Sequence, residues 1–469
     1  MRTMMRDWTR RQFFFTWAPS LFAQRRRRIA EVERPNILLI LADGLGAWMC
    51  GCYGNKEFRT PNIDLLARLG VRFQNAIVVT PAGSPSRATL LTGRTPMQHG
   101  IHDFLTSRPV TDPPQGQSEA PAGFAQEVMI SDMLAQIGYH CGYIGRWHLG
   151  NDAQPGHNFS YTFTYAEEEV THRDPLISRN GRISRVRGYA AELFTNAALE
   201  FLDRVPQGEP FFLVISYLNP NEPYEGHPDR YYELYQGADF KTIGWQPPAG
   251  NALRGRQYLA DIVGNLRKCA AGLTALDDQI GRLLTGLRQK GVWSDTLVAF
   301  TSVHGLLWGR HGLWADGLAS DPINMYDEVV RVPLILSWPG DIPVEATRAE
   351  LVSSYDLLPT LCQLARLDPQ IEQRNLCGRS YLYLAMNLPF DKSEEPWPTL
   401  AFGYYRNTWM ARGRRFKLVL RNEGEGPNEF YDLTQDPRER ENQYDNPGYI
   451  TVRDDMRRRL EQWVEKYSV

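Results

Sequence analysis

The chain has 469 residues, of which 42% are hydrophobic and 23% are charged, a composition typical of a globular protein with one large domain or two to three smaller ones. Its 52 basic and 54 acidic residues give a formal net charge of −2, which argues against a nucleic-acid-binding protein. The six cysteines are too sparse for a disulfide scaffold and include no Cys-x-x-Cys zinc pair, so buried thiols are expected.

The N-terminal segment, residues 1–30, has the pattern of a twin-arginine export signal. Arg10 and Arg11 precede three phenylalanines and a short apolar run that ends at Ala23, as such signals do. The run is broken by Pro19 and is much shorter than the roughly 20 residues that cross a bilayer. A basic tail is the alternative, because four arginines follow the apolar run. The segment predicts a periplasmic or secreted protein without a transmembrane segment.

The first predicted element is a buried strand. Residues 36–42 are a continuous apolar run that ends at Asp43, which is typical of a parallel strand covered on both faces. Because ligands gather beyond the carboxyl ends of such strands, Asp43 lies where a functional site is expected. A helix is predicted from Thr60 to Leu69, with Thr60 as N-cap and Pro61 in the first helical position.

A second helix is predicted to open at Ser84 and Pro85, with Ser84 as its N-cap. Residue 83 would then lie at the positive end of that helix, a place that suits an oxyanion. Further buried strands at 211–216, 297–302 and 332–338, together with a helical stretch at 257–288, predict a parallel or mixed α/β sheet.

After Arg379 the pattern changes to shorter aromatic and basic segments, such as 400–406 and 416–421. This change predicts a small C-terminal subdomain. The expected organisation is an export signal and basic linker at 1–30, an α/β domain at 34–387, and the subdomain at 388–469.

A family resemblance lies in the segment from Gly83 to Arg94. Its sequence GSPSRATLLTGR matches the sulfatase signature Cys-x-Pro-Ser-Arg-x-x-x-Leu-Thr-Gly-Arg at every fixed position except the first. Other sulfatase-like motifs follow at similar spacing: TPNID from Thr60, GRWHLG from Gly145, FTSVHG from Phe300, NMYDE from Asn324, RVPL from Arg331, DLLPT from Asp356 and YDL from Tyr431.

The chain therefore resembles sulfatases of the alkaline phosphatase superfamily from about Pro35 to Asn442. The resemblance implies an α/β/α sandwich with a large mixed sheet, plus a small α+β subdomain with an antiparallel sheet. The resemblance predicts the fold but does not establish the activity.

At the first signature position, Gly83 replaces the residue that carries the family's chemistry. Sulfatases have a cysteine or serine there, oxidised to formylglycine, whose hydrate attacks sulfur. Glycine has no side chain to oxidise, so we expect no formylglycine and no covalent intermediate. Ser84 and Ser86 are the neighbouring hydroxyls, and neither is expected to replace the nucleophile.

The resemblance also implies one divalent cation, usually calcium, beside the nucleophile. The family strand usually ends in two aspartates, whereas this chain has Asp43 and Gly44. A second ligand pair, aspartate followed by asparagine or histidine, corresponds here to Val303 and His304. Asp43 and His304 are thus either a degraded calcium site with weak affinity or a polar remnant.

The groups that hold sulfate in the family are altered as well. Arg146 stands for a lysine, and His148 is retained as an anion contact or a structural histidine. Asp316 stands where a second lysine is expected, and Asn221 where a sulfate-facing histidine is expected. Arg87 is retained and either supports the anion or satisfies carbonyls near the helix start.

These changes together predict an exported pseudoenzyme that binds a sulfated or otherwise anionic glycan, or a protein partner. Trp147, Trp308 and Trp314 are candidates for sugar stacking, with core packing as the favoured alternative. Two further hypotheses remain: a sulfuric or phosphoric ester hydrolase that uses water on a residual metal, and a structural partner of an active paralogue.

Overall fold

The structure is a computed structural model, and it describes residues 34–105, 117–121, 123–166, 170–388, 396–422 and 424–468. The export signal predicted at 1–30 lies outside these residues. Within the part of the chain that is described, no helix is long and apolar enough to cross a membrane.

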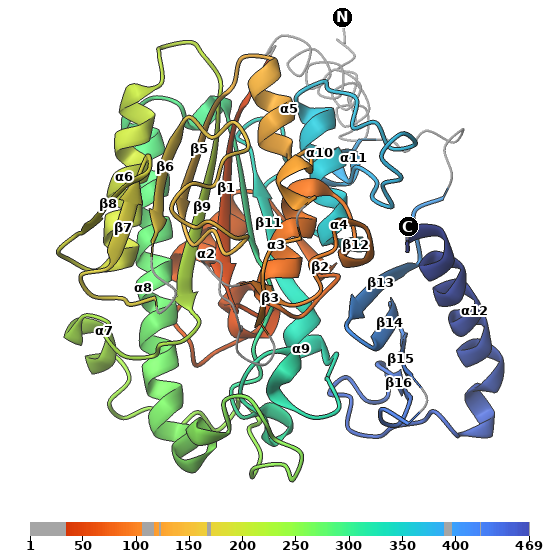
Figure 1. The fold of residues 1–469 in the computed structure, drawn as a ribbon. Coiled ribbons are helices and arrows are strands. Elements are labelled where there is room, and N and C mark those ends of the chain that lie inside the picture. The colour runs from red at the N-terminus through yellow and green to blue at the C-terminus, as the bar shows by residue number, and fades with distance from the viewer. Residues whose placement is uncertain are drawn as a thin grey trace, which may run out of the picture.

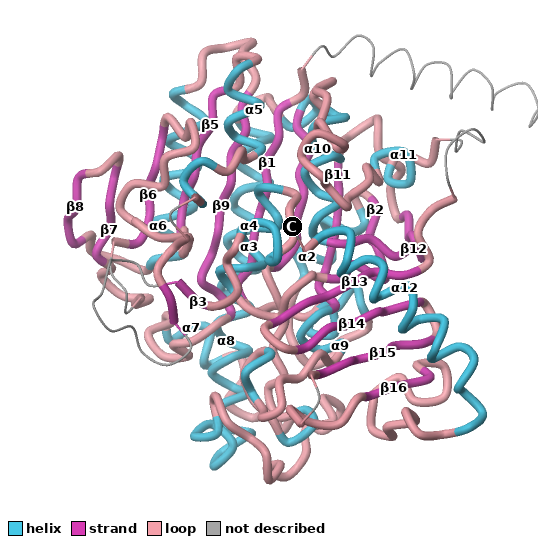
Figure 2. Tube along the Cα trace, turned by 45° about the vertical axis from the view of Figure 1, so that its right-hand side comes forward, coloured by secondary structure: helices cyan, strands magenta, loops and turns pink. Residues whose placement is uncertain are grey.

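A ten-stranded mixed sheet forms the centre of the main domain (Figure 2). Its five middle strands run parallel, and antiparallel pairs lie toward both ends. The strands, in spatial order, are β12 (Ala346–Ser353), β2 (Val71–Ile77), β11 (Arg331–Ser337), β10 (Thr296–Ser302), β1 (Asn36–Asp43), β9 (Phe211–Pro220), β5 (His140–Gly145), β6 (Tyr161–Tyr165), β7 (Leu176–Arg179) and β8 (Arg182–Arg185).

Helices cover both faces of this sheet (Figure 1). One face carries α2 (Pro61–Arg68), α6 (Ala190–Arg204) and α8 (Ile262–Gln289), and the other carries α3 (Gly83–Thr92), α5 (Ile130–Gln136) and α10 (Leu357–Leu364). The α/β/α sandwich expected from the sequence is confirmed.

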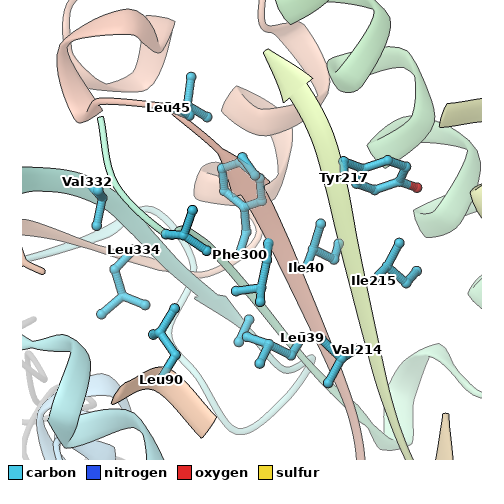
Figure 3. Packing of buried hydrophobic residues seen from close by; sticks show 14 of the residues in the cluster. Leu39, Ile40, Leu45, Leu90, Val214, Ile215, Tyr217, Phe300, Val332 and Leu334 are labelled. Carbon is cyan, nitrogen blue, oxygen red and sulfur yellow. The ribbon is translucent and has the colours of Figure 1, made fainter. Parts of the chain in front are cut away.

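The middle strands are hydrophobic along their whole length because both of their faces are covered. Figure 3 shows Leu39 and Ile40 of β1 packed among side chains of the adjacent strands, including Ile215 and Phe300. These residues are fully buried. The strands predicted at 36–42, 211–216, 297–302 and 332–338 all exist, with β9 extending to Pro220.

Shorter elements complete the main domain. They are α4 (Pro96–His99), α7 (Asp229–Glu233), α9 (Asp327–Val330), α11 (Leu382–Ala385), β3 (Phe104–Leu105), β4 (Gln117–Ser118), and the 3-10 helices η1 (Ala47–Met49), η2 (Gly51–Tyr53), η3 (Phe124–Gln126), η4 (Arg256–Asp261), η5 (Trp293–Asp295), η6 (Arg310–Gly312), η7 (Gly317–Ala319) and η8 (Ser354–Asp356).

The N-cap prediction for Ser84 is wrong. Helix α3 begins at Gly83, and Ala82 is its N-cap. The Ser84 hydroxyl instead accepts a hydrogen bond from the backbone N–H of Leu105 at 3.0 Å, so a partner distant in sequence outcompetes the local cap. The stretch predicted at 257–288 is divided into η4 and α8, whose N-cap is Asp261.

The C-terminal subdomain is a four-stranded antiparallel sheet covered by one long helix, as the family resemblance implies. Its elements are β13 (Leu400–Tyr405), β14 (Thr408–Gly413), β15 (Phe416–Arg421), β16 (Glu429–Asp432), η9 (Pro447–Tyr449) and α12 (Ile450–Tyr467). The backbone N–H of Tyr404 in β13 donates to the carbonyl of Val79 at 2.7 Å, which ties the subdomain to the main domain near α3.

All six cysteines are free thiols; four are buried as expected, whereas Cys52 and Cys377 are half-buried. Trp147, Trp308 and Trp314 are buried in the hydrophobic core, so the core-packing alternative is confirmed and these rings have no face to offer a sugar.

Candidate functional site

Four neighbouring parallel strands deliver the predicted site residues to one edge of the sheet. Asp43 ends β1, and His304, Asn221 and Arg146 follow β10, β9 and β5 by one or two residues. This is the edge at which open α/β sheets bind ligands. Helix α3 presents its N-terminus, with Gly83, to the same place, since residue 83 lies within van der Waals reach of His148.

Asp43 is almost fully buried and contacts four other residues of the site. One carboxylate oxygen lies 2.8 Å from the Arg87 guanidinium and 3.3 Å from that of Arg146. The other oxygen accepts a hydrogen bond from the Asn221 amide at 3.1 Å and lies 3.3 Å from His304 Nε2. Burial alone would raise the pKa of Asp43, but Arg87, Arg146 and His304 together hold it well below its usual range.

Arg87 bonds a backbone carbonyl, which is one of the two roles left open by the sequence; its contact with an anion stays a prediction. Its side chain is fully buried, and besides Asp43 it bonds the carbonyl of Arg146 at 3.0 Å and the hydroxyl of Ser216. It therefore joins helix α3 to strands β1, β5 and β9. Asp43, Arg87 and Arg146 together carry a surplus of one positive charge, and the Arg146 side chain is 16% exposed.

The end of β5 depends on a glycine. Gly145 has a φ of +103°, and a Cβ there would lie 2.0 Å from the carbonyl oxygen of Ser216. Only glycine allows this close approach of β5 to β9, which places Arg146 beside Asp43.

Gly83, by contrast, is not required by the backbone. It lies in the first turn of α3, and a Cβ there would meet His148 Nδ1 at 3.4 Å and Phe104 Cε1 at 3.5 Å, which is ordinary van der Waals contact. Gly44 differs, because its φ is +82° and a Cβ would come within 2.6 Å of the Leu306 side chain. The fold could accept a small nucleophile at 83, whereas a second aspartate at 44 would be strained.

His148 lies beside Gly83 and is more than nine-tenths buried. Its backbone N–H donates to Asp152 at 3.1 Å, and its Nδ1 has no hydrogen-bond partner among the described residues. Burial, with help from Arg146 and Arg87, holds the pKa of His148 well below its usual range. The imidazole is therefore neutral at physiological pH and is a poor source of a catalytic proton.

Asp316 does not face the site as a free negative charge. Its carboxylate caps η7 by accepting from the N–H of Leu318 at 3.0 Å, and it lies 3.4 Å from the guanidinium of Arg254. Arg254 was not predicted from the sequence, because 62 residues separate it from Asp316 and no motif marks it.

The two serines near Gly83 are already engaged. The Ser86 hydroxyl donates to the carbonyl of Val303, and Ser84 accepts from Leu105. Both contacts fix the start of α3 against neighbouring segments, which supports the expectation that neither serine replaces the nucleophile.

Comparison with known proteins identifies the fold and its lineage. The family model described as Sulfatase matches residues 35–367, and the one described as N-sulphoglucosamine sulphohydrolase, C-terminal, matches residues 317–466. The chain belongs to the sulfatase family. The uncharacterized sulfatase YidJ of Escherichia coli (strain K12) is 31% identical to it over 478 residues, covering 93% of this chain and 88% of the relative.

Two solved structures share this architecture over most of the chain. The putative sulfatase yidJ from Bacteroides fragilis superimposes with a TM-score of 0.79 at 26% identity, covering 93% of this chain and 96% of that one. A protein solved in complex with its substrate D-glucosamine-2-N,6-O-disulfate gives a TM-score of 0.76 at 23% identity, covering 92% and 98%. At that identity the second likeness concerns the fold alone.

The sulfatase family implies a divalent cation beside residue 83, but the donors present here do not fit one. Calcium takes six to eight oxygen ligands, and Asp43 supplies the carboxylate at this position with both oxygens already facing Arg87, Arg146, His304 and Asn221. Over the described ranges, no group of three or more His, Cys, Asp or Glu side chains could hold a metal ion.

Proposed function

We propose that this sulfatase-family protein binds a sulfated glycan and does not carry out formylglycine-dependent hydrolysis. The observation that supports this most strongly is the buried ion pair of Asp43 with Arg87 at 2.8 Å. A guanidinium neutralises the carboxylate that a cation would need, and the adjacent Gly83 offers no nucleophile. Two requirements of the family's chemistry are thus missing at one place.

The remaining groups suit an anion. The N-terminus of α3 presents backbone N–H groups and the positive end of the helix dipole. The partly exposed Arg146 adds a full charge, and His148 Nδ1 points at the position where the nucleophile side chain would begin. These groups form charge-assisted and neutral hydrogen bonds with sulfate oxygens. Binding of this kind needs no metal.

The altered residues around Gly83 also fit a protein that no longer catalyses hydrolysis, because catalytic groups that work as a unit lose their effect on the rate together. Once the nucleophile is gone, the metal ligands and the acid that depended on it no longer affect the rate. Gly44, Val303, Asn221 and Asp316 are consistent with such relaxation, whereas the fold that shapes the site is complete. We further propose a periplasmic or secreted location from the Arg10-Arg11 segment, which fractionation of expressing cells would test.

Sulfate release is the experiment that tests the absence of turnover. The purified full chain and a Gly83→Cys variant, with conversion to formylglycine verified by mass spectrometry, are incubated with calcium, an aryl sulfate and sulfated glycans. We expect no release above that of an Arg87→Met control from either protein, because the variant regains the nucleophile but not the cation site.

Turnover by the unmodified chain that is lost in the Arg87→Met control would overturn the proposal and favour hydrolysis by water on a metal. Turnover by the Gly83→Cys variant alone would show that the donors around Asp43 still bind the cation, which would contradict the proposed loss of the metal site.

A further inference from the structure

We propose that Arg254 forms a second anion-binding position next to the α3 N-terminus, so that the ligand is a sugar carrying a second anionic group, a sulfate or a carboxylate, close to the first sulfate. This inference rests on the proposed function and specifies the ligand of that site. It concerns a residue for which neither the sulfatase signature nor any other motif in the chain gives a role.

Phe104 links Arg254 to the α3 N-terminus. The Arg254 guanidinium lies over the Phe104 ring at 4.6 Å from its centroid, and the same ring stacks with His148 at 5.9 Å between centroids and 29° between planes. Phe104 Cε1 is also 3.5 Å from the point where a Cβ at Gly83 would lie. Arg254 is therefore one aromatic ring away from the proposed sulfate position.

The guanidinium is held in a fixed orientation. One terminal nitrogen lies 3.4 Å from Asp316 and the other 3.1 Å from Glu222, whose second oxygen accepts from the Tyr258 hydroxyl at 3.3 Å. The backbone N–H of Arg254 donates to the carbonyl of Leu318 at 3.2 Å. Such fixing lowers the entropy lost when a ligand binds.

Part of the guanidinium stays available. The Arg254 side chain is 36% exposed, and the contacts to Asp316 and Glu222 use two of the five N–H groups of a guanidinium. The two carboxylates outweigh the single charge of Arg254, so the group as a whole carries one negative charge and does not attract an anion over long range. Selectivity would come from directed N–H groups, which match the planar carboxylate or the oxygens of a sulfate at short range.

Arg254 also acts electrostatically on the first position. It is among the charges that lower the pKa of His148 and of Arg146, after burial and the nearer charged groups. Its field therefore reaches the residues proposed to hold the first sulfate. Asp316 stands where the family has a lysine, but Arg254 from another segment supplies a positive charge beside it.

Calorimetric titration with matched sugars tests the inference. The probes are a monosaccharide with one sulfate, the same sugar with two sulfates, and a sulfated sugar with a carboxylate. We expect the unmodified chain to bind at least one dianionic probe about tenfold or more tightly than the monosulfated one. Arg254→Gln should remove most of this preference while changing binding of the monosulfated sugar less than threefold.

Arg230→Gln is the matched control, since Arg230 also lies over an aromatic ring, that of Tyr231 at 4.5 Å, and pairs with an acid, Glu192, at 2.6 Å. It should leave the preference intact. Arg254→Lys, which keeps the charge but loses the planar fork, should reduce the preference partly.

Equal affinity for all three probes, or a preference that survives in a folded Arg254→Gln protein, would overturn the second position while leaving the proposed function standing. Failure of the unmodified chain to bind any of the probes would overturn the proposed function, and this inference with it.

Discussion

Replacing Asp43 with asparagine is expected to lower the free energy of unfolding by about 3 kcal/mol and, at the same time, to raise the affinity for inorganic sulfate several-fold. Arg87 is fully buried and Arg146 is partly exposed, and removal of their carboxylate partner leaves the buried positive charge of Arg87 uncompensated. A bound anion then restores the balance. Chemical denaturation and the rise in Tm with added sulfate measure the two effects.

Asp277→Asn provides the control for a general loss of stability. Asp277 is a buried carboxylate that accepts hydrogen bonds from the backbone N–H groups of Asn62 and Ile63 at the start of α2. Its replacement should destabilise the protein without changing sulfate affinity. If Asp43→Asn weakened sulfate binding, or if calcium raised the Tm of the unmodified chain but not of Asp43→Asn, Asp43 would be a metal ligand after all.

The second large effect is expected in the dependence of stability on pH. His172 and His227 are both buried, with ring centroids 4.4 Å apart, and His227 Nδ1 lies 2.9 Å from the Tyr189 hydroxyl. Burial lowers the pKa of His172 to about 4, and burial together with His172 and Arg173 lowers the pKa of His227 to about 2. Both side chains are therefore neutral in the folded protein at neutral pH.

In the unfolded chain these histidines titrate near pH 6.5. Below that pH the unfolded state binds more protons than the folded state. The contribution of these histidines to the free energy of unfolding is therefore complete above about pH 6.5 and is lost as the pH falls toward 4. Each histidine contributes a slope of up to about 1.4 kcal/mol per pH unit in that window.

Denaturation curves between pH 4 and 7 measure this slope. His172→Phe, which keeps an aromatic ring without a titrating group, should make the slope smaller. An unchanged slope in His172→Phe would show that acid sensitivity arises elsewhere.

Sequence reasoning predicted the parts of the site that are fixed by strand order. Asp43 follows a continuous apolar run, and such a run indicates a buried parallel strand whose end lies at the ligand edge. The family motifs, rather than strand patterns, indicated Arg146, Asn221 and His304, and the structure places all three just after strands at the same edge. The absence of a nucleophile at Gly83 also follows from the sequence alone, since it concerns one residue type.

The contacts between distant segments could not be predicted in this way. Asp43 pairs with Arg87, 44 residues away, and Arg254 reaches Asp316 from a segment with no motif. Ser84 gave a local capping pattern, but Leu105 provides a better partner in three dimensions. In each case the deciding interaction depends on tertiary packing, which periodicity and capping rules do not include.

Metal-independent sulfate binding is tested most directly by calorimetric titration of the full chain with a sulfated oligosaccharide in calcium and, separately, in a chelator. We expect the same dissociation constant in both, with no continuing heat of hydrolysis, because Arg87 rather than a metal neutralises Asp43. Binding that requires calcium, or steady heat release with free sulfate as product, would contradict this expectation.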